Sequence, residues 1–127
     1  MAAVATTDPQ PTTPPATPAP ALQPTPITGD CSAVEAYDWD VRTAYAICMA
    51  ESHGRAWIDN AGLNRDGSTD YGLMQINSIH ADMVGGDLES LRNPAVNIRV
   101  AYSLSHQGSN WTAWSAYNSG AYREYLK

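Results

Sequence analysis

Glu51 is the residue of this sequence whose type and setting most favour acid chemistry. It follows the apolar run Ile47-Cys-Met-Ala50 at the C-terminal end of a predicted helix. The helix dipole is negative at that end, and both the dipole and apolar surroundings favour the neutral form of a carboxyl group. The neutral form is the one that a general acid needs. The alternative interpretation is an exposed glutamate in a terminal turn.

Asp70 is a second carboxylic acid, 19 residues further along the chain, in a polar setting. Its neighbours include side chains that can hydrogen-bond to it, namely Asn64, Ser68, Thr69 and Asn77. One carboxyl group in an apolar setting and one in a polar setting can share the work of cleaving a glycosidic bond. The first protonates the leaving oxygen, and the second stabilises or attacks the positive anomeric carbon. The alternative for Asp70 is a capping or turn residue.

The elements that would position these acids are mostly helical. Apolar residues at helical spacing over 41–49 predict a helix that starts at Asp38 or Asp40 and ends before Gly54. Residues 57–77 predict a small β-hairpin or irregular ribbon, because Asp66-Gly67 is a hairpin turn signal between two apolar segments. Glu51 would therefore lie on a helix and Asp70 on the far side of the ribbon.

Three further helices are expected after the ribbon. A short one covers 79–84 and ends at Gly85-Gly86. The next opens at Asn93-Pro94, an N-cap followed by proline, and closes at Gln107-Gly108. A third contains Trp111, Trp114 and Tyr117 at spacing i, i+3, i+6 and stops near Asn118-Ser-Gly120. The sum is an α+β domain, mostly α-helical, with one small β-hairpin.

Composition divides the 127 residues at about residue 28. Residues 1–28 hold eight of the nine prolines, seven threonines and no aromatic residue, which predicts a disordered, semi-extended tether. Residues 29–127 remain to fold as one domain. The segment at Met1 does not have the basic and apolar regions of a secretory signal, so we expect a cytosolic chain or, on account of the tether, one whose signal was removed.

The charge balance narrows the partners. Thirteen acidic and seven basic residues give a net charge of −6, and the one lysine is the last residue. Nucleic-acid binding requires a basic face, so it is disfavoured, and no apolar run is long enough to span a membrane. Cys31 and Cys48 are compatible either with a disulfide or with two buried thiols. A metal site is not predicted, because no histidine or second cysteine pair lies at the spacing of metal ligands.

Several segments, in chain order, resemble the lysozyme superfamily. Glu51-Ser52 matches its catalytic Glu-Ser pair, and 66–72 (Asp-Gly-Ser-Thr-Asp-Tyr-Gly) with 75–78 (Gln-Ile-Asn-Ser) resembles the hairpin of animal C-type lysozymes. Residues 72–76 (Gly-Leu-Met-Gln-Ile), 93–98 (Asn-Pro-Ala-Val-Asn-Ile) and 116–120 (Ala-Tyr-Asn-Ser-Gly) resemble bacterial lytic transglycosylases. The likeness covers 37–126 and is greatest to small specialised transglycosylases that open the wall for secretion, conjugation or pilus machines.

The resemblance implies a lysozyme-like fold and a role for each matching residue. Glu51 would be the general acid and then the base, and Asp70 the second carboxylate. Aromatic faces and amides suit a sugar ring, and the matching positions are Gln75, Asn77, Trp111, Tyr117 and Asn118. Trp111 would also pack on the glutamate and raise its pKa, whereas Trp114 is expected in the core and Trp57 is undecided. No cofactor or metal is implied.

The implied reaction is cleavage of the β-1,4 bond between N-acetylmuramic acid and N-acetylglucosamine in peptidoglycan. A lytic transglycosylase would leave 1,6-anhydro ends, and the alternative is a hydrolytic lysozyme that uses Asp70. Two other classes are a non-catalytic glycan-binding module and a structural adaptor of a cell-surface machine. We expect an extracytoplasmic, envelope-associated monomer whose partners are glycan strands and a secretion or conjugation machine.

Two departures from C-type lysozymes matter for this prediction. Residues 79–83 (Ile-His-Ala-Asp-Met) replace a tryptophan-rich sugar platform, and two cysteines replace a framework of eight. The acidic balance would also give weak or adverse steering toward anionic peptidoglycan. This charge balance favours a tethered enzyme that remodels the wall locally over a freely diffusing antibacterial one.

Overall fold

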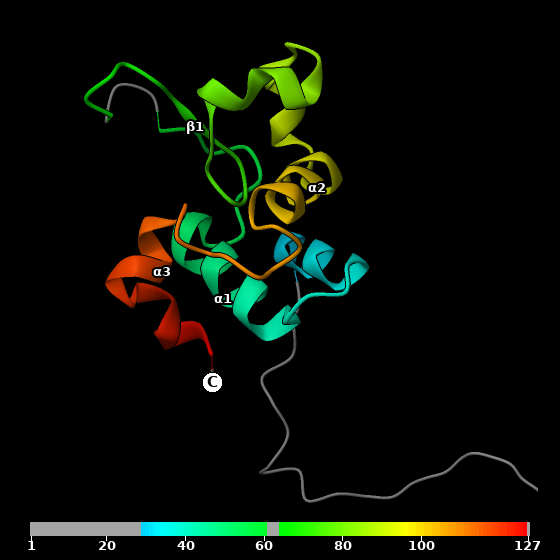
Figure 1. The fold of residues 1–127 in the computed structure, drawn as a ribbon, viewed down its shortest axis with the longest axis vertical. Coiled ribbons are helices and arrows are strands. Elements are labelled where there is room, and N and C mark those ends of the chain that lie inside the picture. The colour runs from blue at the N-terminus through cyan, green and yellow to red at the C-terminus, as the bar shows by residue number, and fades with distance from the viewer. Residues whose placement is uncertain (1–28, 61–63, 127) are drawn as a thin grey trace, which may run out of the picture.

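The computed structural model describes residues 29–60 and 64–126. The predicted tether over 1–28 lies outside the described residues. The described part is an α+β fold, mostly helical, with one small antiparallel sheet (Figure 1). Its elements in chain order are η2 (Asp30–Ala36), α1 (Val41–Ser52), β1 (Asp70–Tyr71), β2 (Ile76–Asn77), η3 (Ser78–Val84), η4 (Leu88–Arg92), α2 (Pro94–Leu104), α3 (Ser115–Ser119) and η5 (Ala121–Tyr125).

Helix α1 forms much of the core. Its side chains from Ala44 to Cys48 are buried without interruption, which is unusual for a helix with one solvent face and typical of one packed on several sides. It packs against η2, α3 and η5, while α2 packs against η2, η4 and β2. A disulfide joins Cys31 of η2 to Cys48 of α1. The two cysteines are 17 residues apart in the sequence, and closing a loop of this length stabilises the fold by about 3 kcal/mol in the chain-entropy model.

The helix starts follow their capping residues. The side chain of Asp40 accepts the Thr43 N–H at 3.3 Å, so α1 begins at the second of the two predicted aspartates. The side chain of Asn93 accepts the N–H groups of Ala95 and Val96 ahead of Pro94, as the Asn-Pro pair predicts. The predicted short helix over 79–84 is present as η3 and ends at Gly85 in the left-handed region.

Two predicted helix ends were wrong. Helix α2 ends at Leu104 rather than at Gln107-Gly108, because the Ser105 hydroxyl accepts the Gly108 N–H and the chain turns into left-handed backbone. Helix α3 begins at Ser115, so Trp111 and Trp114 precede it. The side chain of Asn110 accepts the Thr112 N–H and Trp114 is extended, so local turns rather than a helix bury the two tryptophans.

The ribbon contains two successive turns. The predicted turn at Asp66-Gly67 is present, with the Gly67 N–H bonded to Asn64, and an antiparallel bridge joins Asp59 to Tyr71 on its flanks. A second turn over 72–75 then brings β2 back against β1, so that Asp70 lies opposite Asn77. The ribbon lies to one side of α1 in Figure 1, in green.

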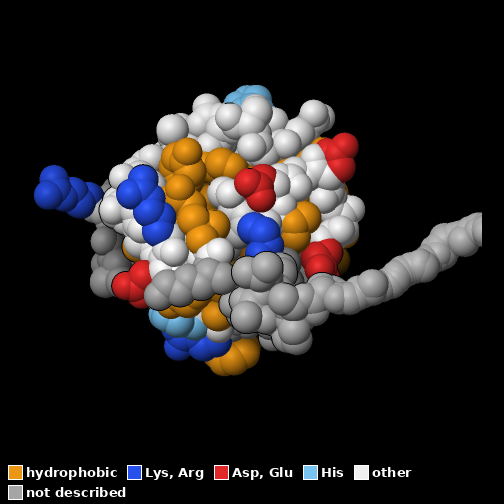
Figure 2. All heavy atoms as spheres, turned by 90° about the horizontal axis from the view of Figure 1, so that it is seen from below, with side chains coloured by type: hydrophobic (Ala, Val, Ile, Leu, Met, Phe, Trp, Pro, Cys, Tyr) orange, Lys and Arg blue, Asp and Glu red, His pale blue; other side chains and the backbone are white. Residues whose placement is uncertain are grey.

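None of the helices within the described ranges is long and apolar enough to cross a membrane. On the face drawn in Figure 2, acidic and basic side chains are scattered singly among polar and apolar ones.

Candidate active site

A cleft of about 270 Å³ lies between the ribbon and the helices, and it contains both predicted acids. Glu51 enters it from the last turn of α1, and Asp70 from β1. The rest of its lining is a set of amides, a histidine, a serine and apolar side chains: Asn64, Gln75, Ile76, Asn77, His80, Leu104, Ala113, Trp114 and Ser115. The fold therefore brings together residues that are up to 64 positions apart in the sequence, since Glu51 and Ser115 face one cavity.

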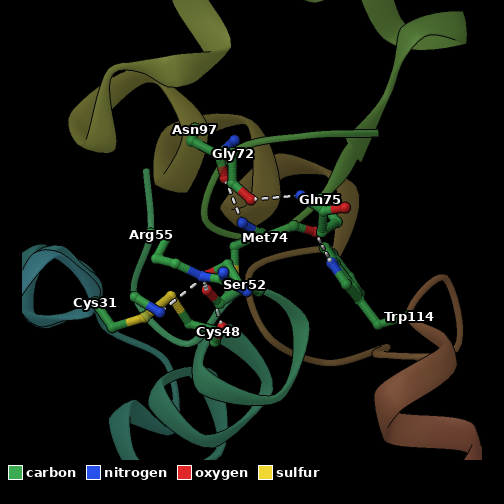
Figure 3. The surroundings of a disulfide bond; sticks show 10 residues. Cys31, Cys48, Ser52, Arg55, Gly72, Met74, Gln75, Asn97 and Trp114 are labelled. Atoms are coloured by element: carbon green, nitrogen blue, oxygen red, sulfur yellow. Dashed lines mark hydrogen bonds between the residues drawn. A yellow bond between two sulfur atoms is a disulfide. The ribbon is translucent and has the colours of Figure 1, made fainter. Parts of the chain in front are cut away.

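Glu51 is held by the way in which α1 ends. Ser52, fully buried, donates its hydroxyl to Cys48 O at 3.0 Å and accepts the Gly54 N–H, and Arg55 donates to Ser52 O. His53 takes the left-handed conformation that closes the helix. These contacts, drawn in part in Figure 3, fix the turn that carries Glu51.

The pKa of Glu51 is raised above the ordinary value for a glutamate. Burial is the main cause, because it disfavours the charged form, and the negative charge of Asp70 adds to the effect. The backbone N–H of Ala116 in α3 donates to Oε2 of Glu51 at 3.3 Å and partly offsets this rise. The net direction favours a protonated carboxyl group at higher pH than usual.

Asp70 is held by two amides. Asn64 donates to Oδ2 at 3.2 Å and Asn77 donates to Oδ1 at 2.9 Å. The orientation of Asn77 is fixed because its own Oδ1 accepts the Ile79 N–H and caps η3, which turns the NH₂ group toward Asp70. One acid is thus set in a desolvated position and the other among amide donors, as the sequence predicted.

Asn97 positions the turn between the two strands. It is fully buried, accepts the Met74 N–H and donates to the carbonyl oxygens of Tyr71 and Leu91, all at 2.8 Å. Figure 3 shows it next to Gly72, with Gln75 and Trp114 on the other side of the turn. These bonds satisfy all the buried polar groups of the amide except one lone pair, so the turn is held rigidly to α2.

The five residues predicted to bind sugar separate into two groups. Gln75 and Asn77 line the cleft, and Gln75 also donates its amide to Gly72 O at 2.9 Å. The other three, Trp111, Tyr117 and Asn118, are not among the lining residues. Their roles as sugar contacts stay predictions.

Those three side chains have partners elsewhere. Trp111 is buried and its ring lies 5.2 Å from that of Trp39. Tyr117 stacks on Tyr122 at 5.0 Å, and the Asn118 amide donates to Thr112 O at 2.9 Å.

The tryptophan that faces the cleft is Trp114. It is also a core residue, 4% exposed, with its indole N–H bonded to Met74 O at 2.8 Å. The prediction that Trp114 packs in the core is therefore correct but incomplete, because the residue also lines the cleft. Trp111 packs behind it at 5.4 Å between ring centres. The apolar wall that faces the cleft is therefore formed by Trp114 with Leu104 and Ile76.

His80, Ala113 and Ser115 were not singled out as site residues from the sequence. His80 lies in the expected helix 79–84, three positions after Asn77, a predicted sugar contact that precedes this helix and caps η3. This nearness in the sequence is the signal that could have placed His80 in the cleft. Ala113 and Ser115 flank Trp114 and carry no such signal.

Comparison with known proteins identifies relatives. Invasion protein IagB of Salmonella typhimurium is 34% identical over 102 residues, which cover 72% of this chain and 62% of IagB. A peptidoglycan-binding-like protein of Escherichia coli O157:H7 is 33% identical over 91 residues, 59% of this chain and 53% of that protein. Protein IpgF of Shigella sonnei is 31% identical over 102 residues, 72% of this chain and 66% of IpgF. The chain thus spans less than two thirds of the length of these relatives.

Among solved structures, a lysozyme from Litopenaeus vannamei is similar at 23% identity and a TM-score of 0.43, covering 75% of this chain and 87% of that one. The family model of the lysozyme-like domain matches residues 32–116, which include both acids of the cleft and Trp114. Since this match extends over more than half of the chain, the protein belongs to the lysozyme-like domain family.

Proposed function

We propose that this protein cleaves the β-1,4 bond between N-acetylmuramic acid and N-acetylglucosamine in peptidoglycan, with Glu51 as the general acid. The observation that carries the proposal is the desolvated Glu51 carboxyl group, with a raised pKa, facing Asp70 across one cleft. A proton on Glu51 passes to the glycosidic oxygen as the bond to the anomeric carbon breaks. Membership of the lysozyme-like family supports the same chemistry.

Asp70 would act on the positive charge that develops at the anomeric carbon. Its carboxylate is already oriented by Asn64 and Asn77, so little reorganisation is needed when the charge appears. Gln75 lies on the same wall and its side-chain carbonyl can accept a hydrogen bond from a sugar hydroxyl or N-acetyl N–H. The apolar wall around Trp114 would exclude water from the acid.

The second step decides between two enzymes. In the lytic transglycosylase that we favour, the 6-hydroxyl of the muramyl residue attacks its own anomeric carbon and Glu51 takes the hydroxyl proton. The product is a 1,6-anhydro end, and no water is consumed. In a hydrolytic lysozyme, water would attack instead, with Asp70 stabilising the cation or forming a covalent intermediate. The hydrolytic lysozyme is retained as a second candidate because Asp70 lines the same cleft as Glu51.

Mass spectrometry of the products should separate the two candidates. We expect native protein incubated with purified peptidoglycan to give muropeptides with ends lighter by one water than reducing ends. We expect Asp70→Asn to be slower by at least about tenfold, or about 1.4 kcal/mol of barrier, with the same anhydro products. Asp82→Asn, which removes the charge of an exposed aspartate outside the cleft, should match the native rate.

Reducing ends from the native protein would favour the lysozyme candidate over the transglycosylase. No soluble product from several chemical types of wall would contradict the enzymatic proposal as a whole.

The rate of cleavage should fall as pH rises through the pKa of Glu51. The first step needs the protonated carboxyl group, and the raised pKa keeps that form to higher pH than an ordinary glutamate would. We therefore expect a descending alkaline limb in the pH profile of kcat/KM, above the usual range of glutamate titration. A rate that still climbs above about pH 8 would contradict this assignment, since an acid with a pKa in the catalytic range loses its proton by then.

The proposed substrate places the site of action in the cell envelope. The leader over 1–28, whose structure is outside the described residues, is proposed as a spacer beside the wall. A tether would raise the local concentration of the enzyme at its substrate. An acidic domain benefits most from this, because electrostatic attraction does not bring it to anionic peptidoglycan. Association with a secretion or conjugation machine is proposed on the resemblance of residues 37–126 to small specialised transglycosylases.

A further inference from the structure

A second cavity, of about 540 Å³, lies between η3 and the C-terminal half of α2. Six residues line it: Met83, Arg99, Tyr102, Ser103, His106 and Gln107. None of them takes part in the proposed cleavage. Most of the lining side chains can donate hydrogen bonds, through a guanidinium, two hydroxyls, an amide and an imidazole. Met83 adds an apolar surface.

The charge of this cavity is opposite to that of the whole chain. The chain carries a net charge of −6, yet the lining includes an arginine and a histidine and no aspartate or glutamate. Arg99 is exposed, and no residue in the described ranges forms an ion pair or a hydrogen bond with its side chain. An arginine without a partner, among other donors, is suited to a carboxylate ligand.

The loop that closes the cavity is strained and firmly held. His106 and Gln107 both have left-handed backbone, with φ of 53° and 62°, which side-chain-bearing residues rarely adopt in succession. Ser105, fully buried, accepts the Gly108 N–H and donates to Tyr102 O. A Cβ atom at Gly108 would lie 2.5 Å from Cβ of Trp39, so the loop sits directly on the core. Strain that is maintained by such packing is typical of binding loops.

The cavity adjoins the cleft across two shared elements. His80 of η3 faces the cleft, and Met83, three residues on, faces the second cavity. Leu104 of α2 faces the cleft, and its neighbour Ser103 faces the second cavity. A peptide of four residues extends over roughly 13 Å at about 3.3 Å per residue. A peptide attached to a sugar in the cleft would extend across η3 and α2 toward the second cavity.

We propose that this cavity binds a carboxylate of the stem peptide carried by the N-acetylmuramic acid residue in the cleft. The inference rests on the proposed function and makes it narrower: the substrate is peptide-substituted glycan rather than bare glycan. Arg99 pairs with the carboxylate, the Gln107 amide and His106 donate to it or to the peptide carbonyls, and Met83 contacts an aliphatic side chain. The stem peptide then positions the muramyl residue for attack.

A binding experiment tests the cavity without requiring turnover. A soluble stem tetrapeptide is titrated into ¹⁵N-labelled protein, and NMR follows the backbone amides. We expect saturable shifts at residues 99 and 102–107, and an affinity at least about tenfold lower, or about 1.4 kcal/mol, in Arg99→Gln. Arg123→Gln removes the same charge from an exposed arginine that lines neither cavity, and it should bind as the native protein does.

Two ligand controls complete this experiment. The same peptide with its carboxylates amidated should bind at least about tenfold more weakly, as Arg99→Gln does. The proposal would be overturned if the chemical shift changes occurred at other residues, or if the amidated peptide or inorganic phosphate bound as tightly as the native tetrapeptide.

A second measurement links the cavity to cleavage. The native protein should cleave peptide-bearing strands faster than strands from which an amidase has removed the peptides. We expect the ratio of the two values of kcat/KM to fall toward one in Arg99→Gln and to keep its native value in Arg123→Gln. A native ratio of one would overturn the proposal. Inactivity of the native protein on both strands would instead contradict the proposed function, and the NMR titration would still decide the cavity.

Discussion

Replacing Glu51 by glutamine is expected to lower the rate of peptidoglycan cleavage by about 10²–10⁴-fold, the usual contribution of a general acid. Glutamine has nearly the same shape and can still accept the Ala116 N–H through its carbonyl oxygen. It cannot supply a titratable proton to the glycosidic oxygen. The fall should therefore appear in kcat, while the affinity for glycan strands stays close to native, as measured by calorimetry with soluble strands.

Glu35→Gln is the matched control. Glu35 is an exposed glutamate in η2 that lines neither cavity, so this variant makes the same change of charge away from the cleft. It should retain the native rate. Equal rates in Glu51→Gln and the native protein would show that another group donates the proton. A large loss in Glu35→Gln as well would show that the net charge, rather than the acid, governs the rate.

The same variant has a second signature, in stability. The folded state raises the pKa of Glu51, so the unfolded chain releases this proton at lower pH than the folded one does. As pH rises through the window between the two pKa values, the native protein loses stability that the glutamine variant keeps. We expect Glu51→Gln to become more stable relative to native across that window and the difference to level off above it. A mutation that merely damaged the fold would show no such pH dependence.

The two acids were predictable because each has a local signal. Glu51 is marked by the apolar run before it and Asp70 by the polar turn around it, and both signals lie within a few residues in the sequence. The caps at Asp40 and Asn93 are local in the same sense. For these acids and caps, whose determining neighbours are close in the sequence, pattern and propensity were sufficient.

The wall of the cleft was not predictable in this way. Trp111 and Trp114 have the same residue type and similar burial, and only packing against Met74 and Trp39 decides which one faces the cavity. Spacing i, i+3 predicted a helix here, but the Asn110 side chain bonds to the backbone and makes a turn instead. The second cavity depends on left-handed backbone at His106, for which a non-glycine sequence gives little sign.

Replacing Gly72 by alanine should destabilise the fold by about 2–4 kcal/mol, which is the sum of a left-handed backbone cost of roughly 1–2 kcal/mol and an overpacking cost of similar size. Gly72 has φ of +73°. An added Cβ would overlap with Leu91 O and would lie 2.5 Å from Nδ2 of Asn97. Neither atom can retreat easily, because Leu91 O is backbone and Asn97 is fixed by three hydrogen bonds.

Gly67→Ala separates the two contributions. Gly67 also has left-handed backbone, with φ of +80°, but nothing lies within 4 Å of an added Cβ. Urea unfolding should therefore show a loss of about 1–2 kcal/mol for Gly67→Ala and roughly twice that for Gly72→Ala. Equal losses would mean that Asn97 and Leu91 yield, and that the turn is not held as tightly as its contacts indicate. This turn joins Asp70 to Gln75 and Asn77, so the folded fraction of Gly72→Ala should also cleave peptidoglycan more slowly. Gly67→Ala leaves Asn97 in place as the anchor of the turn, so this loss of rate is not expected from it.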